Sequence, residues 1–191
     1  MSWIEVETKV KLDKNEISQI KKKILEIAKF DFSKIKKDYY FALKTKGYPK
    51  KAFRLRKNGK DFEVNFKKRI ENLDNPEIAV KEEFEFKIKD PENFIELMKD
   101  LGFIEFIEKE KKSILYRYKD DNKLGIELNY VKNLGYFLEL EYLCQKKDVD
   151  YAKKIIYEAL KKLDIEKSKI DNTGYTKMLF LRGIRNKKYF I

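Results

Sequence analysis

Residues 3–12 read WIEVETKVKL, and their side chains alternate between apolar and polar along most of this stretch. Successive side chains of a β-strand point to opposite faces, so the alternation predicts a strand with one face of each kind. Ile4, Val6, Thr8 and Val10 share the first face, and Glu5, Glu7 and Lys9 share the second. The second face therefore carries two carboxylates followed by an ammonium group.

Further strands are predicted downstream, at about 38–45, 51–57, 61–69, 78–89, 104–119, 123–131 and 136–144. Asn58-Gly59 lies between two of these segments and is a strong signal for a two-residue hairpin turn. Apolar residues at helical spacing predict helices at about 14–29, 91–101, 147–163 and 174–182. The order of elements predicts an α+β fold with a large, mainly antiparallel sheet.

The polar faces of these strands are sorted by charge. Carboxylates occur as Glu-x-Glu pairs on three strands, namely Glu5 and Glu7, Glu83 and Glu85, and Glu139 and Glu141. Basic residues cluster on the remaining strands, at Arg54, Arg56, Lys67, Arg69, Lys111 and Arg117, and Lys81 shares a strand with Glu83 and Glu85. For any one strand, a solvated face of an open sheet is the simpler interpretation. Solvent gives no reason to separate the signs, so the whole pattern favours a closed barrel with the charged face inside.

Such a lumen suits a metal–polyphosphate complex. Carboxylates two residues apart can hold a hard cation, and Lys and Arg side chains can hold phosphate oxygens. The chain has no histidine, which excludes Ser-His and Cys-His catalysis and imidazole-bound zinc. Oxygen ligands favour Mg²⁺ or Mn²⁺.

The composition limits the class of protein. A chain of 191 residues with 42% hydrophobic residues is long enough for one domain with its own core, so we treat 1–191 as a single domain. No apolar run approaches the roughly 20 residues that span a bilayer, and the first residues enter a strand rather than a signal peptide. The single cysteine, Cys144, fits a reducing compartment, so we expect a cytoplasmic protein. The net charge of +12 indicates an anionic partner.

Several of these segments resemble the CYTH superfamily, named for a bacterial adenylyl cyclase and thiamine triphosphatase. Glu5-Val6-Glu7-Thr8-Lys9 resembles its E-x-E-x-K signature. Similar matches follow in order at Asp38-Tyr39-Tyr40-Phe41, Phe53-Arg54-Leu55-Arg56, Phe66-Lys67, Glu82-Glu83-Phe84-Glu85 and Leu134 to Glu141. Gly174-Tyr175 through Leu179 resembles the C-terminal end of the cyclase-like branch.

The resemblance implies an eight-stranded antiparallel triphosphate-tunnel barrel over about 3–144, with helices packed outside and C-terminal helices at about 147–182. It also makes a homodimer a candidate assembly. The implied metal ligands are Glu5, Glu7, Glu139 and Glu141, with Glu83 and Glu85 as nearby candidates. The resemblance assigns the phosphate-binding role to Lys9, Arg54, Arg56, Lys67 and Lys111, and the charged strand faces add Arg69, Lys81 and Arg117. Among these, we expect Glu5, Glu7, Lys9 and Lys111 to be catalytic.

Two positions depart from the family pattern. Ser113 stands where an arginine is usual, two residues after Lys111, so Lys109, Lys112 or Arg117 would have to substitute for it. Asn129 stands where an acidic residue is frequent, which affects any role that this position has in orienting a nucleophile.

The leading hypothesis is a class IV adenylyl cyclase that converts ATP to cyclic AMP and pyrophosphate. The alternative is a metal-dependent triphosphatase acting on tripolyphosphate, thiamine triphosphate or nucleoside triphosphates. A third hypothesis is a non-catalytic module that binds RNA or polyphosphate, with Tyr39, Tyr40, Phe41, Phe53 and Phe66 as stacking platforms. Periodicity places most of these rings in the core, so nucleic acid is the least favoured partner.

Overall fold

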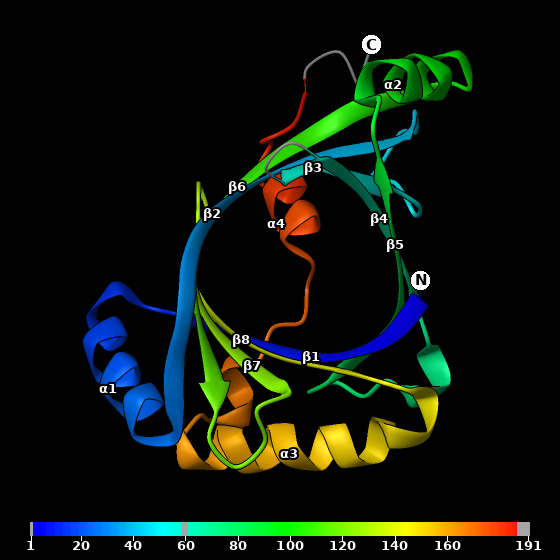
Figure 1. Cartoon of the computed structure of the whole chain (residues 1–191). Coiled ribbons are helices and arrows are strands. Elements are labelled where there is room, and N and C mark those ends of the chain that lie inside the picture. Colours follow the sequence, from blue (N-terminus) through cyan, green and yellow to red (C-terminus); the bar gives the residue numbers. More distant parts are fainter. Residues whose placement is uncertain (1, 59–60, 187–191) are drawn as a thin grey trace.

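Eight antiparallel strands close into a barrel in the computed structural model, which describes residues 2–58 and 61–186 (Figure 1). The strands are β1 (Ser2–Leu12), β2 (Ala28–Leu43), β3 (Phe53–Asn58), β4 (Asp61–Arg69), β5 (Ala79–Ile88), β6 (Phe103–Tyr118), β7 (Leu124–Val131) and β8 (Gly135–Cys144). The helices are α1 (Ile17–Ile27), α2 (Pro91–Asp100), α3 (Val149–Lys162) and α4 (Tyr175–Leu181). The predicted closed barrel is therefore confirmed.

The first strand closes the barrel. Around the barrel the order is β1-β5-β4-β3-β2-β6-β7-β8, so β1 pairs with β5 on one side and with β8 on the other. In this register Glu7 lies opposite Glu141, and Lys9 lies opposite Glu139. On the other side Glu5 lies opposite Lys81. The charged faces of distant segments are thus brought together inside the barrel.

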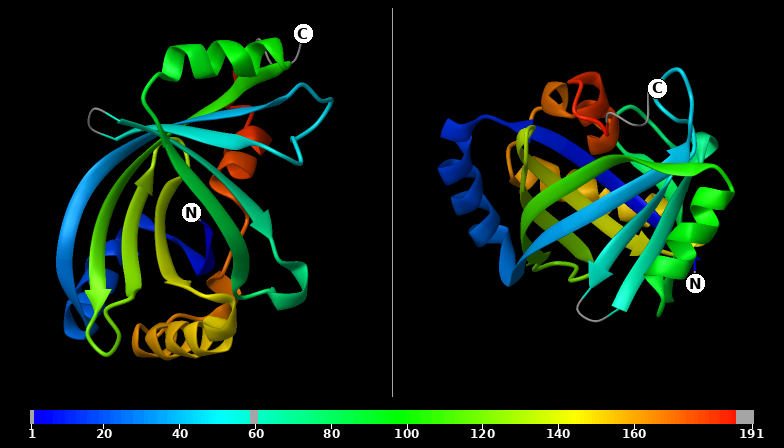
Figure 2. Two further views of the ribbon diagram at one scale, coloured as in Figure 1. Left: turned by 45° about the vertical axis from the view of Figure 1, so that its right-hand side comes forward. Right: turned by 90° about the horizontal axis from the view of Figure 1, so that it is seen from above.

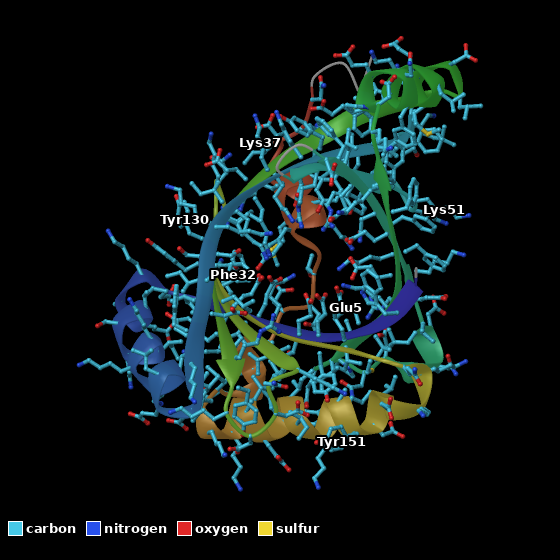
Figure 3. All side chains as sticks on the ribbon, viewed as in Figure 1. Glu5, Phe32, Lys37, Lys51, Tyr130 and Tyr151 are labelled. Carbon is cyan, nitrogen blue, oxygen red and sulfur yellow. The ribbon has the colours of Figure 1, made fainter. Side chains whose placement is uncertain are left out.

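The apolar faces of the strands point outward and form the main core with two helices. Val6, Val10 and Leu140 are fully buried there, as are Ile24 of α1 and Ile156 of α3. Figure 1 shows α3 beneath β1, β7 and β8, and α1 beside β2. Among the side chains labelled in Figure 3, Glu5 points into the barrel and Tyr151 of α3 points away from it. The predicted inversion, with charges inside and apolar groups outside, is confirmed.

The other two helices cover different parts of the barrel. Phe94 and Ile95 of α2 pack against a smaller cluster that contains Phe41 and Leu55. Tyr175 and Leu179 of α4 pack against Phe106, Val131 and Phe137. Figure 2 shows α4 at one end of the barrel. Within the described ranges, no helix is long and apolar enough to cross a membrane.

The start of β2 differs from the sequence-based expectation. We expected a helix to residue 29 and a strand from 38, but α1 ends at Ile27 and β2 runs from Ala28. Apolar and polar side chains alternate only from Ala28 to Ser33, and Phe32 and Ile35 remain exposed. This half of β2 pairs along β6, from Ala28 opposite Tyr118 onward, so tertiary pairing continues the strand through the part where the alternation has stopped.

The expected hairpin between β3 and β4 falls partly on residues 59–60, which lie outside the described residues. The strands on either side pair up to the turn, with Asn58 opposite Asp61.

Two neighbouring residues of α1 test how this helix is held. Ile24 is fully buried in the main core, whereas Leu25 is 50% exposed. We expect Ile24→Ala to lower the free energy of unfolding by about 2–5 kcal/mol, because it leaves a cavity, and Leu25→Ala to lower it by less than about 1 kcal/mol. Urea denaturation followed by circular dichroism measures both. Equal losses in the two variants would contradict the packing of α1 through Ile24.

Candidate functional site

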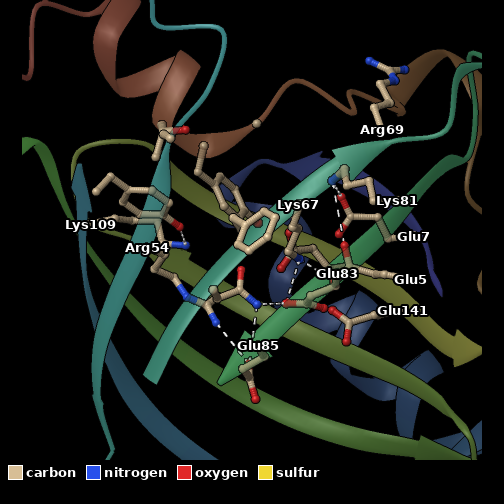
Figure 4. Close-up of a pocket in the computed structure, with 18 of the residues that line it drawn as sticks. Glu5, Glu7, Arg54, Lys67, Arg69, Lys81, Glu83, Glu85, Lys109 and Glu141 are labelled. Atoms are coloured by element: carbon tan, nitrogen blue, oxygen red, sulfur yellow. Dashed lines mark hydrogen bonds and ion pairs between the residues drawn. The ribbon is translucent and has the colours of Figure 1, made fainter. Parts of the chain in front are cut away.

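The barrel encloses a cavity of about 560 Å³ whose lining carries charges of both signs. Nearly all the predicted site residues line it, and Figure 4 shows ten of the lining side chains with labels. The predicted residues on the lining are Glu5, Glu7, Lys9, Arg54, Arg56, Lys67, Arg69, Lys81, Glu83, Glu85, Lys111, Glu139 and Glu141. They come from six of the eight strands, because each strand places every second side chain inside.

Three carboxylates gather at one place on this lining. Glu5, Glu7 and Glu141 each offer an oxygen, and these oxygens lie within 4.8 Å of one another. The strand register explains the cluster, because Glu7 lies directly opposite Glu141 and Glu5 precedes Glu7 by two residues on the same face. We call these three residues the acidic trio.

Burial affects the protonation of the acidic trio. It raises the pKa of Glu5 well above the usual value and the pKa of Glu141 to about 7; neighbouring carboxylates add to both shifts, and Lys67 opposes them. Burial would also raise the pKa of Glu7, but the ammonium groups of Lys81, Lys67 and Lys9 outweigh it and hold this pKa below its usual range.

The trio fits a hard divalent cation. All three donors are carboxylate oxygens, which Mg²⁺ and Mn²⁺ prefer. One oxygen of Glu5, Oε1, is buried and has no hydrogen-bond partner among the described residues, and the Lys81 ammonium lies 3.9 Å from it. A cation here would satisfy that oxygen and relieve the repulsion that helps to raise the pKa values.

The remaining predicted metal ligands have other partners. Glu139 accepts hydrogen bonds from Lys111 Nζ at 2.9 Å and from Asn129 Nδ2 at 2.7 Å. Glu83 accepts from Trp3 Nε1 at 3.1 Å and also from Asn65. These carboxylates therefore hold other side chains of the lumen in place. Glu85 also lies outside the trio, with an oxygen 3.6 Å from Nη2 of Arg54.

The lysines of the cavity are paired with carboxylates. Lys67 donates to Glu5, and Lys81 donates to Glu7. Lys111 Nζ lies 2.6 Å from Glu127 and 2.9 Å from Glu139. Lys111 is buried, whereas Lys67 and Lys81 are partly exposed. Together their ammonium groups can donate to an anion that brings its own cations into the cavity.

Lys9 has a different environment. Its ammonium group donates to the backbone carbonyl of Thr173 at 2.5 Å and lies 4.3 Å from the centre of the Tyr175 ring. The backbone of Lys9 also bonds Asp171 and Asn172, so residues 171–173 run beside β1. Burial lowers the pKa of Lys9, although Glu139 and Glu7 oppose this. Residues 171–173, which precede α4, are therefore hydrogen-bonded to Lys9 of the E-x-E-x-K segment.

Two predicted phosphate-binding arginines lie at or beyond the margin of the site. Arg69 is at the edge of the cavity, with a side chain that is 59% exposed and bonded to Asp74. Arg117 is not among the lining residues, and its Nε donates to Asp31 at 2.9 Å. The structure therefore brings Arg117 to a surface ion pair and not to the cavity.

Sequence reasoning missed several lining residues. Lys36 faces the lumen and donates to Glu127 at 2.8 Å, but it lies in the part of β2 that had no strand signal. Tyr48 lies between β2 and β3, where alternation gives no information, and its hydroxyl is 2.7 Å from that of Thr176. Glu127 could have been found, because it shares a face with Asn129 on β7.

The two departures from the family pattern face the same interior. Ser113 and Asn129 lie opposite each other on β6 and β7, and both are buried. Asn129 donates to Glu139. A neutral amide therefore stands where the family frequently has a carboxylate. Lys109, one of the expected substitutes for the missing arginine, lines the cavity, whereas Lys112 is exposed.

Comparisons with known proteins agree with this geometry. The CYTH domain model matches residues 3–175. A curated protein from Methanocaldococcus jannaschii, whose name proposes an adenylate cyclase, is 33% identical over 188 residues, which cover 95% of this chain and 99% of that protein. A solved structure from Pyrococcus horikoshii is 30% identical with a TM-score of 0.69, covering 90% of this chain and 96% of the other. A second P. horikoshii structure is 25% identical with a TM-score of 0.73, covering 93% and 99%.

Metal binding at the acidic trio is expected to depend on pH. Below about pH 7 Glu141 retains a proton that a cation must displace, so the affinity for Mn²⁺ should fall by up to about tenfold for each pH unit below 7. Calorimetric titration at several pH values, in buffers of different ionisation enthalpy, measures both affinity and proton release.

The matched variant is Glu141→Gln, which removes this proton and one ligand. It should bind Mn²⁺ more weakly at pH 8 and lose most of the pH dependence near 7. An affinity that does not change with pH in the unaltered protein would contradict the protonation assigned to the trio.

Proposed function

The chain belongs to the CYTH domain family, and from that premise we propose that it is a class IV adenylyl cyclase, which converts ATP to cyclic AMP and pyrophosphate with Mg²⁺ or Mn²⁺. The M. jannaschii relative, whose name proposes the same activity, supports this assignment. The observation that carries the proposal is a single cavity that combines the acidic trio with buried lysines and arginines. A metal–triphosphate complex needs both sets of charges at once.

The lysine–glutamate pairs of the cavity indicate how a metal–triphosphate complex would be bound. Lys67 and Lys81 pair with Glu5 and Glu7 of the trio. A phosphate chain gives these lysines new acceptors, and Glu5 and Glu7 are then available to a cation. The exchange keeps every buried charge compensated, which a cation or an anion alone would not achieve.

A divalent ion at the trio would supply charge neutralisation and activation of the attacking group. In the reaction the ribose 3′-hydroxyl gives its proton to water and its oxygen bonds to the α-phosphorus. The bond from that phosphorus to the oxygen it shares with the β-phosphorus breaks, and pyrophosphate leaves with that oxygen. Lys9 and Lys111 would hold the triphosphate in position, and Arg54 and Arg56 would stabilise charge on the leaving group. The protein contributes position and preorganised charge.

The cavity lining favours an organic triphosphate over an inorganic one. Trp3, Tyr40, Tyr48 and Tyr175 line the same space as the charged residues. A tripolyphosphate ion gains nothing from aromatic walls, whereas a base and a ribose can bury apolar surface against them. This supports a nucleoside triphosphate as the substrate.

A triphosphatase remains the alternative, because the same cations could hold a chain whose terminal phosphorus is attacked by water. The RNA-binding hypothesis is weaker. Phe41 and Phe53 stack on each other with ring centres 5.2 Å apart, within the cluster under α2. Two rings packed in this way are not open platforms for bases. Phe66 stacks on Phe84 but also lines the cavity.

Product analysis tests the assignment. We expect the purified protein with ATP and Mn²⁺ to form cyclic AMP and pyrophosphate, and Glu7→Gln to lower the rate at least about 100-fold because it removes a metal ligand. Chromatography of the products with ATP, and separately with tripolyphosphate, is the measurement. The control is Glu77→Gln, which should keep full activity. The Glu77 carboxylate pairs with Lys167 at 2.8 Å, and neither residue lines the cavity.

Orthophosphate without cyclic AMP would contradict the cyclase and assign a triphosphatase to the same cavity. Cyclic AMP formation that survives Glu7→Gln unchanged would contradict the role given to the acidic trio.

A further inference from the structure

Asp38 is a fully buried carboxylate that lies directly behind two cations of the cavity. Its side chain has no exposed surface, and it is not among the lining residues, whereas Arg56 and Lys109 are. The register places Asp38 of β2 opposite Arg56 of β3 on one side and opposite Lys109 of β6 on the other. One carboxylate therefore lies between cationic side chains of both neighbouring strands.

Asp38 holds Arg56 with a two-point contact. Arg56 Nε donates to Oδ1 at 2.5 Å, and Nη2 donates to Oδ2 at 3.0 Å. A paired contact of this kind fixes the plane of the guanidinium as well as its position. It uses Nε and Nη2, and Nη1 lies 4.0 Å from Glu63, beyond hydrogen-bond distance.

Lys109 is held by the same carboxylate. Its ammonium group lies 3.0 Å from Oδ2 of Asp38 and donates to the Tyr40 hydroxyl at 3.1 Å. The same group lies 5.4 Å from the centre of the Tyr40 ring and 5.5 Å from that of Tyr175. The position of Lys109 on the cavity wall is thus also set from behind by Asp38.

The charges at this place stay ionised. Burial would raise the pKa of Asp38, but Lys109 and Arg56 outweigh it and hold the pKa far below its usual range. The pKa of Arg56 is raised above its usual value by its contact with Asp38, against the effect of burial. The three groups carry a net charge of +1, and only the two cations are among the residues that line the cavity.

We propose that Asp38 is a positioning residue that fixes Arg56 and Lys109 as a preorganised pair of phosphate donors. The inference rests on the proposed triphosphate-binding function and extends it to a residue that the substrate does not touch. The phosphate meets donors whose orientation is set before binding, so little ordering entropy is lost on binding.

Simple charge counting predicts the opposite effect for this residue. A carboxylate next to an anion site repels the anion, so replacing it with a neutral group should strengthen binding if charge alone matters. A positioning role predicts weaker binding, because the two cations lose their fixed arrangement. The sign of the change therefore separates the two explanations.

The experiment measures the affinity for tripolyphosphate by calorimetry at constant Mn²⁺ and ionic strength. We expect Asp38→Asn to weaken binding at least about tenfold. In an Arg56→Gln background, the same change should cost no more than about threefold, because its main target has been removed. Asp164→Asn is the surface control. Its carboxylate pairs with Lys23 at 3.1 Å on the outside of the protein, and it should bind as the unaltered chain does.

The outcomes separate cleanly. Equal losses from Asp38→Asn in the two backgrounds would show a general structural role and overturn the proposal, as would unchanged or tighter binding. If Asp38→Asn does not fold by circular dichroism, Arg56→Lys decides, since it keeps the charge but cannot make the two-point contact. Binding at least about fivefold weaker supports the proposal, and unaltered affinity overturns it.

Failure of the underlying function is distinguishable from failure of this inference. An unaltered protein that binds no triphosphate overturns both. An unaltered protein that binds tripolyphosphate, together with an Asp38→Asn variant that binds equally well, overturns the positioning role alone.

Discussion

A closed sheet with its charged face inside requires buried charges to find opposite charges within the barrel. The structure meets this requirement through pairs across strands, such as Glu5 with Lys67, Glu7 with Lys81, and Glu127 with Lys36 and Lys111. Unpaired, any of these groups would be costly to bury. The same inversion leaves the apolar face outside, where water would meet it. α1 and α3 cover that face, so the main core lies between sheet and helices and not inside the barrel.

Acidic and basic groups in one lumen can exchange partners at little electrostatic cost. Carboxylates that neutralise lysines at one moment can bind a metal at another, provided that an anion takes the lysines. The acidic trio and its lysines form one such set, and Asp38 with Arg56 and Lys109 forms another. The sets differ in depth, because the trio lines the cavity and Asp38 lies behind its cations. The carboxylates of the trio can therefore exchange lysines for a metal ion, whereas Asp38 keeps Arg56 and Lys109 in a fixed arrangement.

Much of this arrangement could be predicted from alternation alone. The period of two in residues 3–12 and in β8 placed Glu5, Glu7 and Glu141 on one face, and the sorting of charges indicated that the face is internal. Alternation cannot give register, however, and register decides that Glu141 rather than Glu139 lies opposite Glu7. Alternation also fails to predict a strand segment that is held mainly by pairing with a neighbouring strand. In β2 the alternation stops after Ser33, so Lys36 was missed, and without the register of β2 on β6 the pairing of Arg117 with Asp31 could not be foreseen.

The position of β1 between β5 and β8 has a consequence for how the chain folds. Two of the trio carboxylates lie in β1, and the third lies in β8. The pairing that joins these strands connects residues far apart in the sequence, and contacts of this kind form late and slowly. β1 must therefore wait, with an apolar face unprotected, until β8 has been synthesised. The cavity has no partly functional precursor, because its metal ligands meet only when the last seam of the barrel closes.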